Sequence, residues 1–270
     1  MHESVNRSGH SPERQVPGEK DIGPVLHGWA YEPGTISVRK VVGTDGLPKV
    51  QLRLDLGLLQ MEMTGRPDGG KPHGCESLLD YYERRLRSHI GRQGNEMGFG
   101  LAPADCQGLR DESLMYYHRY LSLFVLGEYP GVARDTEHNL RVLDLCSKFA
   151  ADETDRMALE QYRPYILMMN ARARASIQLH RHEYRKALKI VRRTLRRIRE
   201  FFLQFGQARA YRRSGEVRVL KQLRNEISQH VPPDPVLALK KQLRRAIHEE
   251  RYEEAARLRD ELTRLSGSAS

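Results

Sequence analysis

The sequence is short of cysteine and of long apolar runs. Only three cysteines occur among 270 residues, Cys75, Cys106 and Cys146, and no two are close in sequence. This spacing excludes a Cys-x-x-Cys metal site and a disulfide framework, and it is typical of a reducing cytoplasm. No apolar run approaches the ~20 residues that span a bilayer. The polar, proline-containing start also lacks the apolar core of a signal peptide. We therefore expect a cytoplasmic protein.

Signatures of catalysis are also missing. The chain has no Gly-x-x-x-x-Gly-Lys-Ser/Thr loop for nucleotide phosphates, and no acid–base pair that its pattern places in a cleft. His180 with His182, and His73 with Cys75, lack a second pair at metal-ligand spacing. We expect no enzyme activity, no bound metal and no cofactor.

Acidic residues are scarce in one segment. Between Arg172 and Arg224, seventeen Lys and Arg residues are opposed by three Glu, whereas the whole chain carries a net charge of +10. A helix is expected from about Tyr184 to Gly206, because apolar residues recur there at helical spacing. Its apolar stripe consists of Leu188, Val191, Leu195, Ile198, Phe202 and Phe205. Its other faces carry Arg185, Lys189, Arg192, Arg193, Arg196, Arg197 and Arg199.

Two interpretations of this basic surface remain open. It is either an electrostatic contact surface for nucleic acid or an acidic protein, or a solvated face that acids of other helices partly neutralise. The candidate neutralising residues are Glu137, Asp144, Asp152, Glu153 and Asp155. Nucleic-acid modules usually place aromatic residues among the basic ones, and here only Tyr211 does so.

The N-terminal third predicts a small β unit. Residues 1–27 read as a disordered lead, and 28–101 as a β-hairpin followed by a short helix over 76–89. Apolar residues alternate from Val50 to Leu58, the period of a strand with one buried face. The apolar set then shifts by one position, which predicts a bulge at Gly57–Leu58 in a continuing strand.

The segment 102–230 predicts a body of antiparallel helices. Five are expected, over about 103–126, 128–149, 153–179 with either a kink or a restart at Pro164, 184–205 and 216–229. Two turns have the same pattern, Glu128-Tyr129 followed by Val132 and Glu183-Tyr184 followed by Ala187, 55 residues apart. Together these features resemble tetratricopeptide-type helix pairs.

The last stretch predicts a helical hairpin over 236–266, after a proline linker at 231–235. Asp234 is the expected N-cap, and Pro235 suits the first helical position. Apolar residues recur at helical spacing on both sides of a tight turn at Arg251-Tyr252. They are Leu239, Leu243, Ala246 and Ile247 before the turn, and Ala255, Leu258, Leu262 and Leu265 after it.

The run Tyr-Glu-x-Ala-Ala-x-x-Arg-Asp at 252–260 resembles the UVR motif, through which UvrB and UvrC pair and which also occurs in Clp ATPases and McsA adaptors. The resemblance implies a protein–protein contact element and no reaction. The partner, either another protein or a second copy, would be gripped by the residues of the motif. These are Leu239, Leu243, Ala246, Ile247, Tyr252, Ala255, Ala256, Arg259, Asp260 and Leu262.

The sequence thus predicts a mostly α protein of the α+β class: a β-hairpin unit, a tetratricopeptide-like helical array and a UVR-type helical hairpin. The predicted function is a non-catalytic adaptor or scaffold linked to UvrABC-type repair or Clp-type proteolysis. The alternative is a nucleic-acid-binding accessory factor of nucleotide excision repair that uses the basic helices over 185–224.

Overall fold

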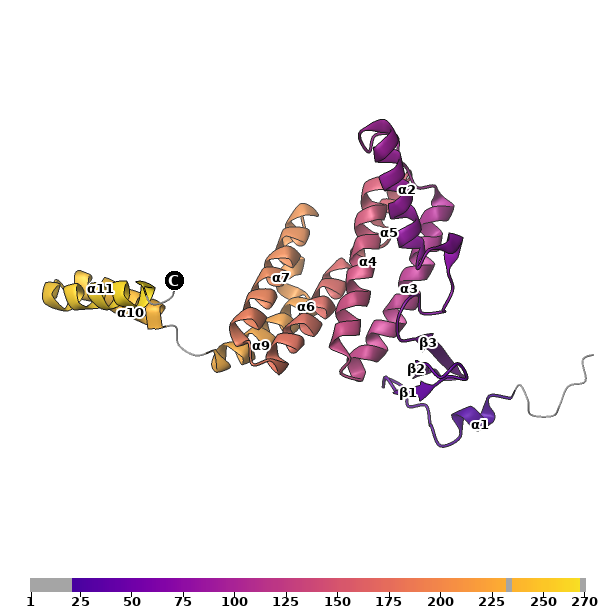
Figure 1. Ribbon diagram of the computed structural model, residues 1–270, viewed down its shortest axis with the longest axis horizontal. Coiled ribbons are helices and arrows are strands. Elements are labelled where there is room, and N and C mark those ends of the chain that lie inside the picture. The colour runs from indigo at the N-terminus through magenta and orange to yellow at the C-terminus, as the bar shows by residue number, and fades with distance from the viewer. Residues whose placement is uncertain (1–20, 232–234, 268–270) are drawn as a thin grey trace, which may run out of the picture. The chain divides into compact units, whose positions relative to one another are not determined.

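The computed structural model describes residues 21–231 and 235–267 (Figure 1). The chain divides into two compact units, Met1–Glu160 and Gln161–Ser270, so the predicted helical body is split at Glu160. The predicted cap Asp234 and residues 1–20 of the predicted lead lie outside the described residues. Within the described end of that lead, Gly23–Leu26 forms the short helix α1.

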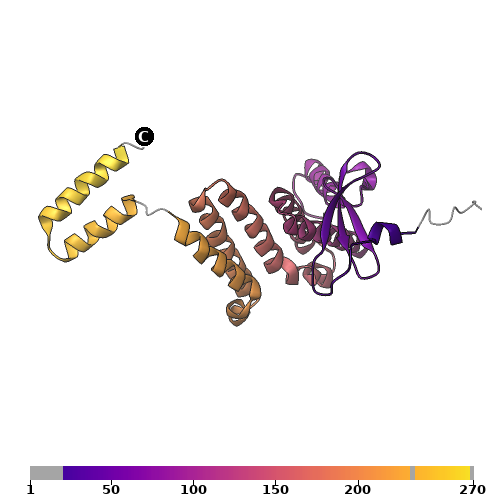
Figure 2. The ribbon, with the colours of Figure 1, turned by 90° about the horizontal axis from the view of Figure 1, so that it is seen from below.

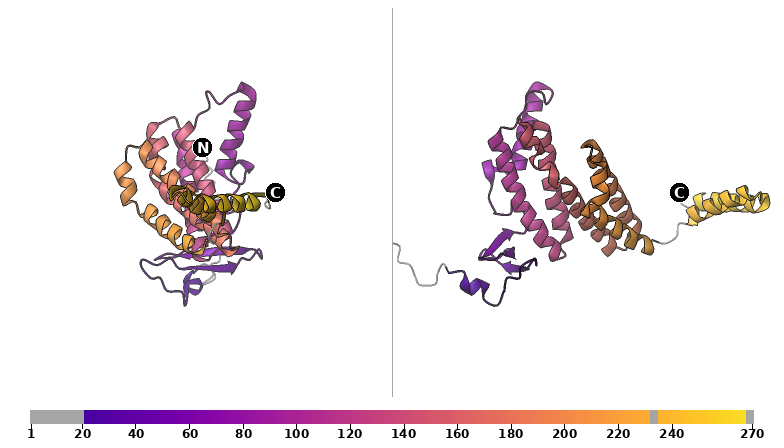
Figure 3. Two further views of the ribbon diagram at one scale, coloured as in Figure 1. Left: turned by 90° about the vertical axis from the view of Figure 1, so that its left-hand side faces the viewer. Right: turned by 180° about the vertical axis from the view of Figure 1, so that it is seen from behind.

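The β unit is one antiparallel sheet in the order β1-β2-β3, formed by β1 (Val38–Val42), β2 (Pro48–Arg53) and β3 (Leu58–Glu62). Val50, Leu52 and Met61 are buried on one face, where Leu126 packs against them. Figure 3 shows the sheet lying across one end of the helices α3 and α4. A three-stranded sheet with a covered apolar face meets the usual size requirement for stability.

The predicted bulge at Gly57–Leu58 was wrong, because the chain turns back there and starts a third strand. The Leu54 N–H donates to the Gly57 carbonyl over 2.9 Å, and the Arg53 guanidinium donates to the same carbonyl over 2.8 Å. A tight turn and a bulge both shift an alternating pattern by one position. The apolar pattern alone therefore could not distinguish them, and the predicted hairpin is a three-stranded meander.

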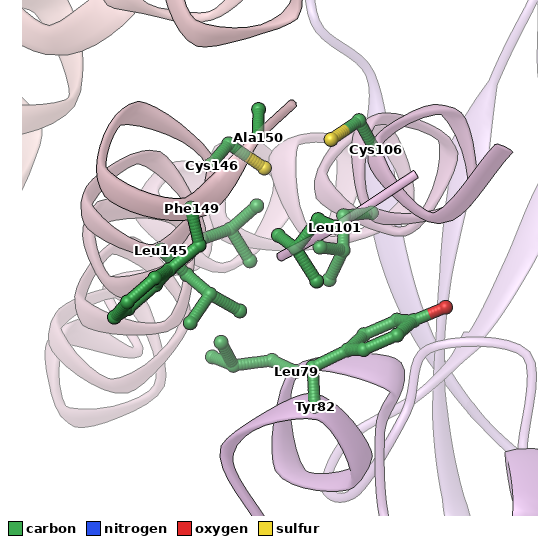
Figure 4. Close-up of a cluster of buried hydrophobic side chains, with 10 residues drawn as sticks. Leu79, Tyr82, Leu101, Cys106, Leu145, Cys146, Phe149 and Ala150 are labelled. Atoms are coloured by element: carbon green, nitrogen blue, oxygen red, sulfur yellow. The ribbon is translucent and has the colours of Figure 1, made fainter. Parts of the chain in front are cut away.

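Helices α2 (Leu78–Gln93), α3 (Pro103–Val125), α4 (Tyr129–Phe149) and α5 (Glu153–Ala158) complete the N-terminal unit. Leu79 and Tyr82 of α2 pack against Leu145 and Phe149 of α4 in one buried cluster (Figure 4). Cys106 and Cys146 lie in the same cluster as free thiols, and Cys75 is also free and buried. Burial raises the pKa of Cys146 to about 12, so this thiol stays protonated and serves as an apolar core residue.

A buried ion pair between α3 and α4 also bonds to the sheet. Arg119 donates from Nε and Nη2 to the two carboxylate oxygens of Asp135 over 2.6 and 2.8 Å, and neither side chain is exposed. The third guanidinium nitrogen donates to the Glu62 carbonyl at the end of β3 over 3.0 Å. A buried charge pair costs desolvation. That cost is offset here because each guanidinium nitrogen and each carboxylate oxygen has a hydrogen-bond partner.

A second buried carboxylate, Glu112 of α3, caps the first turn of α2. It accepts from the backbone N–H groups of Leu78 and Leu79 over 2.8 and 3.1 Å, and His138 Nε2 lies 3.2 Å from it. Burial opposes the ionisation of Glu112. The nearby His138 ring and the hydrogen bonds from the two amides outweigh that effect and hold the pKa of this carboxyl below its ordinary value.

The second unit contains α6 (Arg163–His180), α7 (Tyr184–Gln204), α8 (Ala208–Arg213), α9 (Gly215–His230), α10 (Pro235–His248) and α11 (Tyr252–Gly267), preceded by the 3₁₀ turn η2 (Glu160–Tyr162) at the boundary. Helices α6, α7 and α9 pack on one another. The restart at Pro164 is confirmed, with the proline in the first turn of α6. The short helix α8 was not predicted. Its six residues follow Gly206, and they are too few to display a period.

One turn geometry recurs between consecutive helices. Gly127, His182 and Glu250 each have a positive φ, of 74°, 56° and 55°. At each site the N–H of this residue donates to the carbonyl three residues earlier, and the N–H of the next residue donates to the carbonyl five residues earlier. These hydrogen bonds are 2.8 to 3.1 Å long. This is the Schellman motif. The repeated turn sequence around Tyr129 and Tyr184 therefore corresponds to a repeated structure, and Tyr252 follows the same turn.

Because this turn position has a positive φ, introducing glycine there should stabilise a turn and removing glycine should destabilise it. Glu250→Gly should stabilise the α10–α11 turn by about 0.5–1 kcal/mol, because glycine avoids the Cβ clash of a left-handed residue at some cost in chain entropy. Gly127→Ala should destabilise its turn by about 1 kcal/mol. Amide hydrogen exchange on the flanking helices measures both local free energies. Equal exchange in Glu250→Gly and the wild type would contradict the expectation.

Candidate functional site

The helices α10 and α11 form an antiparallel hairpin (Figure 2). Leu239, Ala246 and Ala255 are buried, with exposed fractions of 9%, 0% and 8%. They occupy the stripe along which the two helices face each other, and Leu243, Leu258 and Leu262 on the same stripe are partly buried. The hairpin predicted over 236–266 is therefore present. Its inner seam contains the predicted apolar residues except Ile247, which is exposed, and Leu265, whose side chain lies outside what the structure describes.

The other predicted contact residues point to solvent. The exposed fraction is 53% for Ile247 and 69% for Tyr252, and Ala256 is also exposed. Arg259 and Asp260 are exposed as well, and they lie 3.4 Å apart, Nη2 to Oδ1. Tyr252, Ala256 and Arg259 follow one another at helical spacing and so share one flank of α11. The structure thus separates an inner seam from an outer surface.

This separation matters most at the two adjacent alanines. Ala255 faces inward and permits the close approach of α10. Ala256 is exposed on the outer flank, where its small side chain forms a shallow depression between two larger side chains, Tyr252 and Asp260. Sequence reasoning placed both alanines in one contact. A charge at position 255 would open the hairpin itself, whereas a charge at position 256 would alter only the outer surface.

Ion pairs close the turn of the hairpin. Arg245 contacts Glu249 over 2.7 Å and Arg251 contacts Glu254 over 2.6 Å, with a further pair between Arg251 and Glu249. All of these side chains are well exposed, so solvent screens the pairs and each contributes little to stability. The turn is therefore fixed mainly by its backbone hydrogen bonds.

The second candidate surface lies on α7. Its apolar residues Leu188, Val191, Leu195 and Ile198 are buried, which confirms the predicted seam, and Phe202 and Phe205 are partly buried. All seven predicted basic residues are exposed. Five of them recur at intervals of four and three along one line: Arg185, Lys189, Arg192, Arg196 and Arg199. We call these five residues the basic stripe; it spans about 21 Å at 1.5 Å per residue.

Most of these cations have no carboxylate partner. Among the described residues, no ion pair involves any of Lys189, Arg192, Arg193, Arg196, Arg197 and Arg199. Of the acids suggested to neutralise them, Asp155 is paired with Arg110 over 2.5 Å. The segment 161–231 contains eighteen Lys and Arg against four Glu, a net charge of +14, while 1–160 carries −5.

The aromatic residue next to this surface, Tyr211, contacts other side chains of the protein. Tyr211 of α8 packs edge-on against Phe202, with ring centroids 6.2 Å apart, and the Lys221 amine lies 5.8 Å from its ring. Its ring therefore already makes two contacts with side chains of the second unit. The basic surface is suited to contacts with a phosphate backbone or with carboxylates.

Two negative observations complete the survey of the described residues. Over 21–231 and 235–267, no three His, Cys, Asp or Glu side chains are grouped so that they could hold a metal ion. No helix in these ranges combines the length and the apolar character needed to cross a bilayer.

Comparison with known proteins gives one match. Residues 236–268, about an eighth of the chain, match the family model described as the UvrB/uvrC motif. The match covers α10 and α11 and confirms the resemblance stated from the sequence. Neither the curated proteins nor the solved structures that were searched contain a match to this chain.

Proposed function

We propose that this protein is a non-catalytic adaptor whose C-terminal hairpin pairs with a UVR-type hairpin of another protein. The observation that carries the proposal is the match of residues 236–268 to the UvrB/uvrC motif, with Ile247 and Tyr252 exposed on the folded hairpin. Pairing would bury these side chains in a four-helix arrangement. Proteins of UvrABC-type repair and of Clp-type proteolysis in the cytoplasm are the partner classes that this motif suggests.

The size of the hairpin supports a partner. Its helices have 14 and 16 residues, and segments below ~40 residues seldom bury enough apolar surface to be stable alone. Leu243, Leu258 and Leu262 retain partial exposure along the inner seam. A second helix pair would cover this remaining apolar surface and stabilise both hairpins.

Ala256→Glu tests the adaptor function. The variant should weaken binding to a UVR-containing partner at least tenfold, because it introduces a charge that loses its hydration at the interface. The binding should be measured with the full chain against purified UvrB, UvrC, a UVR-containing Clp ATPase and the chain itself. Glu is a good helix former, so α11 should keep its helicity, which circular dichroism checks.

Gln242→Glu provides the matched control. It adds the same charge at an exposed position of α10 and should leave the affinity unchanged. Equal binding by Ala256→Glu and Gln242→Glu would contradict an interface on the outer flank of α11. Failure of the wild type to bind any of the four proteins would contradict the adaptor proposal.

A second candidate function is nucleic-acid binding by the helices over 185–224. The observation that favours it is the basic stripe, in which Lys189, Arg192, Arg196 and Arg199 are exposed and have no carboxylate partner among the described residues. B-DNA carries a phosphate every ~3.4 Å along each strand, so a straight row of cations of this length could neutralise several phosphates. In that case the hairpin would recruit the protein to a repair complex.

A further inference from the structure

A pocket of about 260 Å³ is formed by residues of the N-terminal unit, whereas both surfaces considered above belong to the second unit. One face of α2 supplies most of its wall, with the 3₁₀ turn η1 (Pro72–Gly74) and the segment after α2 supplying the rest. The lining side chains are His73, Tyr81, Arg84, Arg85, Ser88, His89, Arg92 and Phe99.

The charged side chains that line this pocket are all positive. Its lining contains three guanidiniums and two imidazoles but no carboxylate, although 1–160 carries a net charge of −5. The acids of the neighbouring surface are engaged elsewhere: Glu83 pairs with Arg141, and Asp105 accepts from the Tyr82 hydroxyl over 2.7 Å. Asp105 approaches Arg85 only to 4.0 Å. Such a concentration of guanidiniums favours a phosphate group.

The aromatic walls are fixed in place. The His73 ring stacks on Tyr81 with centroids 4.1 Å apart, and His89 meets Phe99 edge-on at 5.8 Å. His89 Nε2 lies 2.7 Å from the Met97 carbonyl, which can only accept, so this nitrogen carries the proton. Nδ1 of His89 is then an acceptor, and the Ser88 hydroxyl is a second uncharged polar group among the lining residues.

His73 enters the pocket wall from a left-handed backbone position. Its φ of 51° lies in the region that costs a residue with a Cβ ~1–2 kcal/mol relative to glycine. Its imidazole ring forms part of the pocket wall.

We propose that this pocket binds a nucleoside monophosphate. Arg84, Arg85 and Arg92 would hold the phosphate, while the planar base would lie against the aromatic walls. The volume lies just below the usual ~300–1,000 Å³ of small-molecule sites and so fits one nucleotide rather than two. The same chemistry is presented by a free nucleotide and by the phosphorylated end of a single strand.

Calorimetric titration of the full chain with AMP and UMP tests the proposal, with adenosine and inorganic phosphate as partial ligands. At least one nucleotide should bind, and each partial ligand should bind at least about tenfold more weakly, because it satisfies only one part of the pocket. Inorganic phosphate binding as tightly as the nucleotides, or no binding of either nucleotide, would overturn the assignment.

Three variants localise the binding. Arg84→Ala with Arg92→Ala should weaken nucleotide binding at least about tenfold. His73→Gly removes one wall of the pocket while relieving the backbone, so it should lose affinity without losing stability. Arg87→Ala removes an exposed charge of the same helix outside the pocket, and it should bind normally. Unchanged affinity in the double variant would overturn the site.

A last comparison separates the two sources of the ligand. Trinucleotides with and without a 5′ phosphate are titrated into the variant Arg192→Glu, Arg196→Glu, Arg199→Glu, so that the basic stripe does not contribute. Tighter binding of the phosphorylated strand than of AMP assigns the pocket to strand ends, and the reverse assigns it to free nucleotides. The substitutions Arg84→Ala and Arg92→Ala are then added to this triple variant. Either result supports the site if they abolish the difference in affinity between the phosphorylated strand and AMP. A difference in affinity that persists overturns the site.

Discussion

Arg119→Ala should lower the free energy of unfolding of the N-terminal unit by about 3–5 kcal/mol, enough to unfold much of it. The substitution removes both hydrogen bonds to Asp135 and the one to the Glu62 carbonyl, and it leaves a buried carboxylate with less compensation. Urea denaturation followed by fluorescence measures the effect. The signal comes from this unit because Trp29 is the single tryptophan of the chain.

Arg134→Ala is the matched control. Arg134 contacts the same carboxylate over 2.8 Å and also donates to the Met63 carbonyl, but its side chain is 42% exposed. Its loss should cost ~1 kcal/mol or less, because solvent already screens this charge. Arg119→Met combined with Asp135→Leu should recover much of the lost stability, since it leaves no unpaired charge in the interior, and Arg134, which loses its carboxylate partner, is partly exposed to solvent. Equal losses in Arg119→Ala and Arg134→Ala would contradict the importance of burial.

Reversing three charges of the basic stripe should nearly abolish nucleic-acid binding if the helices over 185–224 carry that function. Each lost phosphate contact lowers the slope of log affinity against log salt by about 0.9 for duplex DNA. Arg192→Glu, Arg196→Glu and Arg199→Glu together should therefore flatten the slope by up to about 2.7. Fluorescence anisotropy with labelled DNA and RNA over a salt series measures both quantities.

The control for this variant keeps the same net charge. Lys240→Glu, Arg244→Glu and Arg257→Glu change three exposed cations of the hairpin and should leave the slope close to that of the wild type. Similar slopes for both triple variants would mean that overall charge governs binding, and not the basic stripe. Absence of binding by the wild type at low salt would remove this candidate function and leave the adaptor.

The helical part of the fold was predictable because its periodic signal is long. α3, α4, α7 and α9 each carry apolar residues over four or more turns, and Pro103 and Pro164 fix the beginnings of α3 and α6. The hairpin was predictable for a further reason, since its motif specifies both helices and the turn. The three-stranded sheet was not, because a turn at 54–57 shifts the pattern in the same way as a bulge.

The charged interior could not be read from the sequence. Glu112, Arg119 and Asp135 are fully buried, yet each stands among polar neighbours on a helix and resembles a surface residue in any periodic pattern. Their partners lie on other elements, so only the tertiary structure reveals the pairing. The nucleotide pocket was missed for the same reason. The distinction between Ala255 and Ala256 also required the orientation of α11 against α10.

The cap that Glu112 provides for α2 has a consequence for the order of folding. The amides of Leu78 and Leu79 leave the ribosome 34 and 33 residues before the carboxylate that accepts from them, and Arg119 precedes Asp135 by a further 16. At roughly 5–20 residues per second, translation keeps these groups unpaired for seconds. The Glu112 cap of α2 can therefore form only after that part of α3 has been synthesised, and the Arg119–Asp135 pair only after the start of α4.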